Sequence, residues 1–299
     1  MTTTSGESEP GVVLTHPRRP LIPSAGLTKA GLARYYQRIA KVALPHWRDR
    51  ALTLRRFPEG ICEEGFFQKH APDSRPAWVQ TVSLAAEDGQ VCHLLAQDTS
   101  TLAWLANLSA LELHLSPARQ DAPRHPDRVI FDLDPSGDDF GAVQEAARLL
   151  RALLTELELE PNVQTTGSRG LHVVLSIARG HDFDVVHGFA KAVAARLAEA
   201  HPDRLTDAQR IAARGEKVFI DYLRNSYGQT SVAPYSLRAK PGAPIATPVS
   251  WEEALARGFG PQRYRLDNIF RRLGQKRDPW ADITDSPQHL APALERLGL

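Results

Sequence analysis

The sequence predicts a protein of the α+β class, and three features support this prediction. Hydrophobic strand patterns are interleaved with amphipathic helix patterns in the middle of the chain. A hairpin pattern in the N-terminal half indicates antiparallel strand pairing as well. The 299 residues are 42% hydrophobic and show no internal repeat, which is typical of one large domain or two closely packed ones rather than a string of modules.

The first elements expected along the chain are a tail, a helix and a strand. Residues 1–12 are mostly small and polar, which is typical of a disordered tail. Thr28 can cap a helix, because its side chain can accept a hydrogen bond from the first turn. The apolar face of this helix is formed by Leu32, Tyr35, Tyr36 and Ile39. Leu52 and Leu54 then alternate with polar residues, which indicates a strand.

A β-hairpin is predicted over residues 78–97. Asp88-Gly89 supplies the left-handed turn between two β-prone segments. A short helix is expected to begin at Ser100 and to run to residue 108. The next segment alternates in polarity, so a strand there carries Glu112 and His114 on one face.

The middle and the C-terminal part predict strands and helices in alternation. Strands are expected over residues 129–134, 171–176 and 218–222. Amphipathic helices are expected over residues 140–157, with Asp138 or Asp139 at the start, and over residues 186–197. A loop is predicted around Pro241, Pro244 and Pro248. Two further helical stretches are expected over residues 251–257 and 263–273.

Composition excludes several classes of protein. No segment approaches the roughly 18 apolar residues that a membrane span needs, and the N-terminus lacks the pattern of a signal peptide. We therefore expect a cytoplasmic protein with no membrane partner. Cys62 and Cys92 are the only cysteines, which excludes a disulfide framework and a cysteine-rich zinc site. Both thiols are expected to be free and buried.

Net charge alone makes no case for a nucleic-acid partner, since 36 Lys and Arg residues balance 35 Asp and Glu residues. The distribution of charge is more informative. Basic residues gather at residues 18–19, 48–56, 224–240 and 263–277, whereas acidic residues concentrate at 132–160. A basic surface around a small acidic site would suit a polyanion held over bound metal ions.

The strongest chemical signal is the pair Asp132 and Asp134. Because they are two residues apart on a strand, their side chains leave the same face roughly 7 Å apart. Their carboxylates repel each other unless a cation lies between them. Two oxygen-bound divalent ions could activate an attacking hydroxyl and stabilise a leaving pyrophosphate. The alternative is a solvated strand end that leads into the turn at residues 135–139.

Two further segments support a site that binds metal ions and a triphosphate. Asp221 lies in an apolar strand, where an unpaired carboxylate is costly, so it either completes a metal site or pairs with Arg224. Residues 165–172 read Thr-Thr-Gly-Ser-Arg-Gly-Leu-His, and the glycines allow the backbone to approach a ligand. Arg169, His172 and the hydroxyl groups offer hydrogen-bond donors to a triphosphate. The alternative is an ordinary loop, with His172 as a polar residue at a strand start.

Taken in order, FDLDP (131–135), TGSRGLH (166–172) and FIDYLRN (219–225) resemble the three motifs of archaeo-eukaryotic primases. Other segments resemble the polymerase domain of bacterial ligase D in particular: residues 14–17, 27–29, 66–72, 104–107, 234–238 and 278–280. The resemblance covers nearly the whole chain. It implies a primase-like core with mixed or antiparallel central sheets flanked by helices, in a single domain over residues 13–299.

The resemblance also implies which residues perform the chemistry. Asp132, Asp134 and Asp221 would be the catalytic residues and would hold two divalent ions, with Mn²⁺ favoured over Mg²⁺. His114 would face the sugar of an incoming NTP or dNTP. The rest of the nucleotide would be bound by Thr166, Ser168, Arg169, His172, Arg224 and Arg238.

Contacts with DNA are implied at two further places. Arg19 and Lys29, with His16 close by, would bind a 5′-phosphate at a gap or break. Phe66 or Phe67 would stack on a base, an interaction worth roughly 1–3 kcal/mol, and the alternative is that they are core residues.

At three positions the chain departs from the family pattern: Arg19 replaces a usual lysine, Thr166 a usual serine, and Arg169 a frequent lysine. Each exchange keeps the charge or the hydroxyl group.

The function implied by the resemblance is a DNA repair polymerase. It would add nucleotides to 3′ ends at gaps and double-strand breaks in bacterial non-homologous end joining, at the nucleoid, with Ku and an ATP-dependent DNA ligase as candidate partners. Two other functions could use the same fold: a non-catalytic module that binds DNA ends, and a two-metal nuclease. The complete set of three acids argues against the first, and the triphosphate-compatible turn argues against the second.

Overall fold

A computed structural model describes residues 12–87 and 89–299. The elements of the N-terminal part are β1 (Pro20–Ile22), β2 (Leu27–Thr28), α1 (Lys29–Trp47), β3 (Arg50–Arg56), β4 (Phe66–Gln68), β5 (Thr81–Ala86), β6 (Gly89–Leu94), α2 (Thr99–Asn107) and β7 (Ala110–Arg119). Those of the middle are β8 (Arg128–Pro135), α3 (Phe140–Glu156), β9 (Asn162–Thr165), β10 (Leu171–Ser176), α4 (Phe183–Ala200), β11 (Leu205–Thr206) and β12 (Val218–Asp221). The chain continues through β13 (Ser231–Val232), β14 (Thr247–Val249), α5 (Trp251–Leu255), α6 (Ile269–Gln275) and α7 (Ala291–Leu297).

Two sheets form the centre of the molecule. The larger has six strands in the order β11-β12-β8-β10-β9-β14, and the smaller has four in the order β13-β7-β3-β4. Within these sheets β11 and β12 are parallel, and the other pairings are antiparallel. The strands β5 and β6 form a separate hairpin, and β1 pairs with β2. The predicted α+β class with mixed or antiparallel sheets is therefore confirmed.

Alternating polarity decides which way each sheet faces. On β8, the odd-numbered residues from Val129 to Leu133 join an apolar cluster with α3 and α4, so Asp132 and Asp134 lie on the opposite face. On β7, the odd-numbered residues from Leu111 to Leu115 join a second cluster with α1 and α2, which leaves Glu112 and His114 on the opposite face. Each sheet therefore buries its apolar face under helices and presents a partly polar face to the other sheet.

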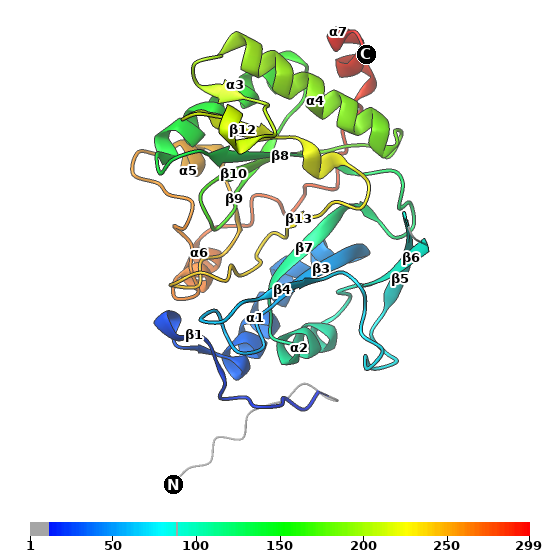
Figure 1. The fold of residues 1–299 in the computed structure, drawn as a ribbon, viewed down its shortest axis with the longest axis vertical. Coiled ribbons are helices and arrows are strands. Elements are labelled where there is room, and N and C mark those ends of the chain that lie inside the picture. The colour runs from blue at the N-terminus through cyan, green and yellow to red at the C-terminus, as the bar shows by residue number, and fades with distance from the viewer. Residues whose placement is uncertain (1–11, 88) are drawn as a thin grey trace.

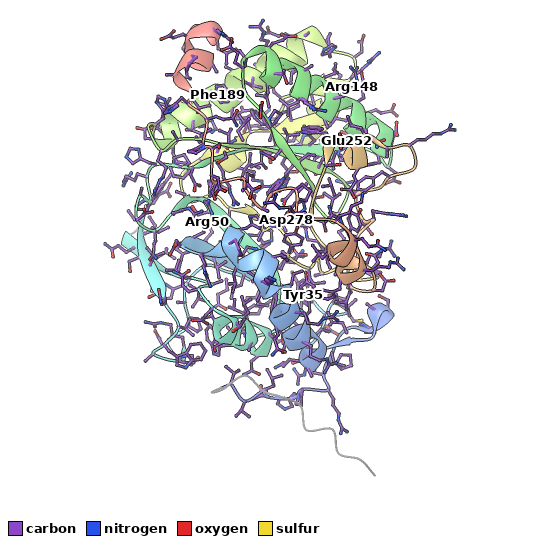
Figure 2. All side chains as sticks on the ribbon, turned by 180° about the vertical axis from the view of Figure 1, so that it is seen from behind. Tyr35, Arg50, Arg148, Phe189, Glu252 and Asp278 are labelled. Carbon is purple, nitrogen blue, oxygen red and sulfur yellow. The ribbon has the colours of Figure 1, made fainter. Side chains whose placement is uncertain are left out.

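The result is a stack of four layers (Figure 1). The helices α3 and α4 cover one side of the six-stranded sheet, and α1 and α2 lie on the far side of the four-stranded sheet. Figure 2 shows the same order from behind. Phe189 lies in the layer of α4, Tyr35 lies in α1 near the other end, and Arg50 and Asp278 lie between them.

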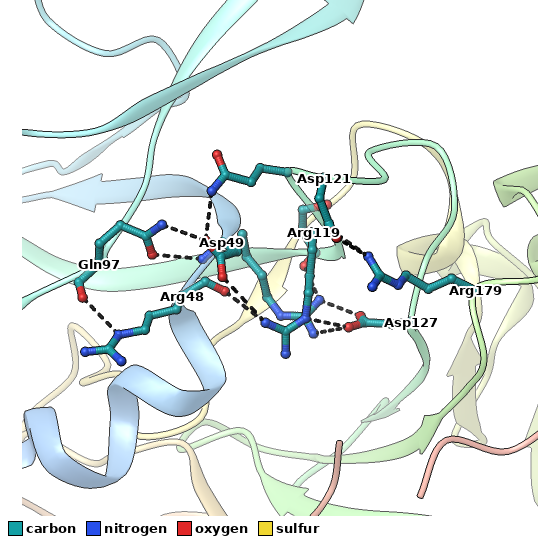
Figure 3. A network of polar contacts seen from close by, with 10 residues as sticks. Arg48, Asp49, Gln97, Arg119, Asp121, Asp127 and Arg179 are labelled. Carbon is teal, nitrogen blue, oxygen red and sulfur yellow. Dashed lines mark hydrogen bonds and ion pairs between the residues drawn. The ribbon is translucent and has the colours of Figure 1, made fainter. Parts of the chain in front are cut away.

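A network of ion pairs connects the two sheets (Figure 3). Asp127, which directly precedes β8, accepts hydrogen bonds from both terminal nitrogens of Arg50 on β3 at 2.7 Å. It also accepts one from Nε of Arg119 on β7 at 2.9 Å. Burial alone would raise the pKa of Asp127, but the charge and hydrogen bonds of Arg50 outweigh burial and lower the pKa to about 2.

Several predicted elements begin at the capping or turn residue that the sequence indicates. The Thr28 side chain accepts a hydrogen bond from Gly31 N at the start of α1, and Asp139 does the same for Gly141 N at the start of α3. The predicted hairpin is present as β5 and β6, and Gly89 has the positive φ of 121° that the turn pattern indicates. Asp88, the other turn residue, lies outside the described residues.

Other predictions need correction. The helix expected at Ser100 begins at Thr99, because Asp98 accepts the hydrogen bond from Thr101 N and is the cap. Pro248 lies in β14 rather than in a loop, which is possible because β14 is an edge strand. The helix expected from residue 263 begins only at Ile269, because Arg265 pairs with Pro244 in a β-bridge instead.

Smaller corrections concern the ends of elements and the exposure of thiols. The strand predicted to residue 222 ends at Asp221, and the helix predicted to residue 257 ends at Leu255. Cys62 is exposed and Cys92 is half-buried, so the expectation of two buried thiols is wrong. Residues 1–11 of the predicted tail lie outside the described residues, while Val12 is buried in the cluster of α1 and α2. None of the helices formed by the described residues has the length and apolar character that crossing a membrane requires.

Candidate functional site

A pocket of about 380 Å³ lies between the two sheets. The six-stranded sheet contributes Asp132, Asp134 and His172 to its wall, and the four-stranded sheet contributes Arg55, Glu112 and His114. These are the polar faces that remain after each sheet has buried its apolar side chains. The pocket contains most of the predicted metal- and nucleotide-binding residues: Asp132, Asp134, His114, Thr166, Ser168, His172, Arg224 and Arg238.

The three predicted metal-binding acids lie on one face of the sheet because of strand register. The strands β8 and β12 are antiparallel, and Asp221 pairs directly with Asp132 across them. Directly opposed residues of neighbouring strands project to the same side, so both carboxylates lie on the face that also carries Asp134. The alternative of a pair between Asp221 and Arg224 is present as well, with Arg224 Nε 3.5 Å from Asp221 Oδ2 and 3.9 Å from Asp132 Oδ2.

The electrostatics of these acids indicate an excess of negative charge. The charge of Asp132, followed by burial, raises the pKa of Asp134 to about 6. Burial also raises the pKa of Asp221. For Asp132 itself, burial opposes ionisation, but the charges of His172 and Arg224 outweigh it and lower the pKa.

Asp132 Oδ1 is buried without a hydrogen-bond partner. An orphaned carboxylate oxygen beside two further carboxylates fits a hard divalent cation, which takes oxygen ligands. Across residues 12–87 and 89–299, no three His, Cys, Asp or Glu side chains are already arranged as a complete ligand set. The three acids share a face and would have to turn toward a common ion to bind it.

His172 is held beside Asp132 by a residue that the motifs do not include. Its Nε2 is 3.4 Å from Asp132 Oδ2, and its Nδ1 is 3.1 Å from the side-chain nitrogen of buried Gln164. The same nitrogen of Gln164 also donates to the carbonyl of Val232 at 3.3 Å. Both ring nitrogens of His172 therefore have a polar neighbour, and the contact of Nε2 with Asp132 contributes to the lowered pKa of that carboxyl.

The turn at residues 166–170 keeps its shape through its own hydrogen bonds. The Thr166 hydroxyl donates to Gly170 O and accepts from the main-chain nitrogens of Ser168 and Gly170, at 3.1–3.2 Å. Gly167 adopts φ 64°, and a side chain at Gly170 would lie 2.0 Å from Leu133 O. The Thr166 hydroxyl therefore shapes the turn. Ser168 lines the pocket, while the side chain of Arg169 is exposed and does not line it.

Arg238 reaches the pocket from the segment that follows β13. Its Nη1 donates to the carbonyl of Thr166 at 2.7 Å, and its Nε lies 3.4 Å from Glu112 Oε2. His114, beside Glu112 on β7, places Nε2 3.3 Å from the same oxygen. Burial lowers the pKa of His114, so its imidazole is neutral at neutral pH.

The residues predicted to bind a 5′-phosphate form a separate group near the start of α1. Lys29 is buried, and its Nζ donates to the carbonyl of Asn107 at 2.9 Å. Burial lowers the pKa of Lys29, and the charges of Arg19 and Arg56 lower it further. Arg56 is thus a third cation at this place, whereas His16 is exposed on the neighbouring segment.

Phe66 and Phe67 lie on the edge strand β4 with exposures of 47% and 62%. The alternative that either is a core residue is therefore wrong. Phe67 packs edge-on against His114 with ring centroids 5.7 Å apart, and the guanidinium of Arg56 lies over the ring of Phe66. Phe67 lines the polar pocket, whereas Phe66, the next residue on β4, projects from the other face of the strand beside Arg56.

Sequence reasoning assigned no role to several polar residues of the site, among them Arg55, Glu112, Gln164 and Lys69. Glu112 could have been found, because alternation along β7 gives it the same face as His114. Arg55 could have followed from it, since Arg55 pairs with Glu112 across β3 and β7. Lys69 lies within residues 66–72, so the resemblance of that segment could have pointed to it, whereas Gln164 carries no local signal because only the fold brings it beside His172.

Comparison with known proteins gives consistent results. A family model described as the primase-polymerase domain of LigD matches residues 28–280. The multifunctional non-homologous end joining protein LigD of Mycolicibacterium smegmatis is 35% identical over 96% of this chain, and that of Pseudomonas aeruginosa is 34% identical over 96%. The chain spans only 37% and 34% of the lengths of those two relatives.

A solved structure, the polymerase domain of Mycobacterium tuberculosis ligase D in complex with DNA, superimposes with a TM-score of 0.86 at 31% identity. The match covers 93% of this chain and 100% of that one.

Proposed function

Because the chain belongs to the family of LigD primase-polymerase domains, we propose that it is a nucleotidyltransferase that adds nucleotides or ribonucleotides to DNA 3′ ends at gaps and double-strand breaks. The observation that carries this proposal is the register of β8 and β12, which sets Asp221 opposite Asp132 at a pocket rich in arginine. Acids for metal ions and cations for phosphates face the same cavity, as phosphoryl transfer requires.

Asp132, Asp134 and Asp221 are the residues that would hold two divalent ions, Mn²⁺ or Mg²⁺. When bound, such ions lower the pKa of an attacking hydroxyl and neutralise a leaving pyrophosphate. The side chains of the protein would bind and orient the nucleotide. Arg238, Arg224, Arg169 and His172 would offset the negative charge of the triphosphate, and Ser168 would donate to it. His114 faces the nucleotide from the opposite sheet, at its sugar.

The DNA would lie along the exposed rings of Phe66 and Phe67 and reach the cations near the start of α1. Glu59 already pairs with Arg19, and the remaining positive charge of Arg19, Lys29 and Arg56 favours a further anion among them. A 5′-phosphate on the far side of a gap is such an anion, and it would fix the distance from the pocket to the break. Sealing the filled gap requires a ligase, so we further propose that an ATP-dependent ligase and Ku act with this chain.

One assay tests the proposed reaction against its alternatives. Labelled gapped DNA with a 5′-phosphate is incubated with Mn²⁺ and each NTP or dNTP in turn. We expect the primer strand to lengthen. Shortening would instead indicate a two-metal nuclease, and an unchanged but bound substrate would indicate a non-catalytic module that binds DNA ends.

A second experiment tests the metal site through Asp134→Ala. We expect this variant to lose nucleotide addition while it still binds DNA, because Asp134 lies on the metal side of the pocket. Saturating Mn²⁺, at about 100 times its dissociation constant, should stabilise the natural protein by about 2.7 kcal/mol and the variant by much less. The control is Asp138→Ala, an exposed acid four residues away. Primer extension by Asp134→Ala at the natural rate would exclude the proposed site.

A further inference from the structure

Glu112 is a buried carboxylate in the wall of a pocket that we propose binds a triphosphate. Its side chain is 1% exposed, and four donor groups lie within 3.4 Å of its oxygens. Oε1 accepts from the main-chain nitrogen of Ala239 at 2.9 Å and lies 3.4 Å from Arg55 Nη1. Oε2 lies 3.3 Å from His114 Nε2 and 3.4 Å from Arg238 Nε. Both oxygens are thus shared between groups from three segments of the chain.

The chemistry of this carboxylate needs an explanation. Burial alone would raise the pKa of Glu112, yet the hydrogen bond from His114 and the charge of Arg238 outweigh it and lower the pKa to about 2. Glu112 is therefore an anion at neutral pH. A fixed anion repels a triphosphate, so its presence in this wall is unfavourable unless it organises groups that attract the ligand more strongly.

Arg238 is the first group that Glu112 organises. Its Nη1 donates a hydrogen bond to the Thr166 carbonyl, and its Nε lies 3.4 Å from Glu112 Oε2 in an ion pair without a hydrogen bond. The bond from Ala239 N to Glu112 also fixes the main chain directly beside Arg238. A guanidinium held in this way loses little conformational entropy when it binds phosphate. Without Glu112, Arg238 would keep a single anchor.

His114 is the second group. Its imidazole is neutral, so only one ring nitrogen carries a proton. Glu112 can only accept, and it therefore requires the proton on Nε2. This leaves Nδ1 of His114 as the hydrogen-bond acceptor for a ligand hydroxyl. The carboxylate thus determines which tautomer the pocket presents.

We propose that Glu112 is a positioning residue for nucleotide binding, which holds the Arg238 guanidinium and the His114 tautomer in the arrangement that an incoming nucleoside triphosphate meets. The inference rests on the proposed nucleotidyltransferase function and deepens it, because Glu112 acts through two neighbours and need not touch the nucleotide. The amide of Glu112→Gln has nearly the same shape. However, it would turn a donor toward His114 or Arg238 and release both from their present orientation.

The test measures nucleotide affinity and primer extension for Glu112→Gln. We expect the KM and the dissociation constant for NTP to rise about tenfold, since charge-assisted hydrogen bonds are lost. The change in kcat should be smaller, and the affinity for 5′-phosphorylated gapped DNA should stay within about twofold. The matched control is Glu253→Gln. Glu253 is also mostly buried, has a pKa of about 2 and pairs with Arg272 and Lys276, but it lies outside the pocket.

A double-mutant cycle gives a second, sharper readout. If Glu112 acts through Arg238, then Arg238→Met should weaken nucleotide binding strongly in the natural protein and only slightly in the Glu112→Gln background. Additive losses would overturn the inference. Should Glu112→Gln fail to fold, Glu112→Asp retains the charge and withdraws it by one methylene. It should show the same selective rise in the KM for NTP, and an unchanged KM would also overturn the inference.

These outcomes separate the inference from the proposed function. If the natural protein neither binds NTP nor extends a primer, the proposed function is wrong, and the inferred role of Glu112 is then wrong as well. If the natural protein extends primers and Glu112→Gln has the same KM as Glu253→Gln, only the inference is wrong.

Discussion

The acids of the pocket illustrate how a single residue acquires its properties from its neighbours. Asp134 has a raised pKa because Asp132 lies two residues before it on the same face. Glu112, on the opposite sheet, has a lowered pKa because donors surround it. One pocket therefore holds Asp134, whose pKa a neighbouring acid raises, and Glu112, whose charge is already offset by its neighbours. A bound cation would stabilise the first of these carboxylates.

Lys29→Ala tests the proposed phosphate site at the start of α1. We expect affinity for gapped DNA with a 5′-phosphate to fall about tenfold, because a charge-assisted contact is lost. Affinity for the same DNA without the phosphate should change much less. Fluorescence anisotropy with the two DNAs measures the ratio. Lys41→Ala, an exposed lysine on the same helix, is the control. Equal losses on both DNAs would contradict the assignment.

Single residues were predictable from sequence where a motif or a strand pattern named them. Asp132 and Asp134 follow from their spacing on β8 alone. That Asp221 lies opposite Asp132 follows from the order of β12 beside β8, which hydrophobic periodicity does not contain. Gln164 and Arg56 were missed for the same reason, since each is brought to its site by contacts between distant segments.

At the scale of elements, the turn at residues 166–170 is the most constrained part of the site, and Gly170→Ala tests this. A methyl group there would lie 2.0 Å from the carbonyl oxygen of Leu133, which is main chain and cannot rotate away. We expect the free energy of unfolding to fall by about 3 kcal/mol. Nucleotide addition should be lost as well, because Leu133 lies between Asp132 and Asp134.

Urea denaturation and primer extension measure the two effects of Gly170→Ala. Gly137→Ala is the matched control, because a methyl group at Gly137 would meet nothing within 4 Å. A Gly170→Ala protein of natural stability would show that β8 and the turn can move apart at little cost.

Elements were predictable where periodicity and caps agree, as for α1, α3 and the hairpin. Elements were not predictable where the main chain pairs with another segment instead of forming a helix. Residues 263–268 have a helical composition, yet Tyr264 and Arg265 pair with the segment around Pro244, and α6 begins later. The loop predicted at Pro248 is likewise a strand, because β14 lies at the edge of its sheet and a residue there needs no main-chain donor.

At the scale of the whole molecule, Asp127 joins β3, β7 and the start of β8. In Asp127→Asn, Arg50 would keep its charge in a fully buried position without a counter-charge. We therefore expect the free energy of unfolding at pH 7 to fall by about 3 kcal/mol, as for other broken buried pairs. Urea denaturation measures the change. Asp121→Asn, which removes an exposed pair with Arg179, should cost less than about 1 kcal/mol. Similar values for the two variants would contradict this role.

The pH dependence of stability offers an independent test of the same pair. The pKa of Asp127 is lower in the folded protein, at about 2, than the roughly 3.9 of an unfolded chain. Its stabilising contribution is therefore complete above about pH 4 and is lost as the pH falls toward 2. The stability difference between the natural protein and Asp127→Asn should shrink over this range. A difference that stays constant from pH 6 to pH 3 would contradict the assigned pKa.

The separation of the two apolar clusters, each outside its own sheet, has a consequence for how such a protein can diversify. On β3 and β7 the pocket side chains point inward, while the two larger apolar clusters lie on the outward faces of the sheets, and a smaller cluster of Ile130, Val174, Trp280 and Ile283 lies on the inward side. Exchanging an inward side chain on β3 or β7 can therefore change which nucleotide is accepted without creating a void in either core. New specificities can therefore arise by mutation of these two strands, because the side chains that line the pocket and those of the larger apolar cluster lie on different faces of β3 and β7.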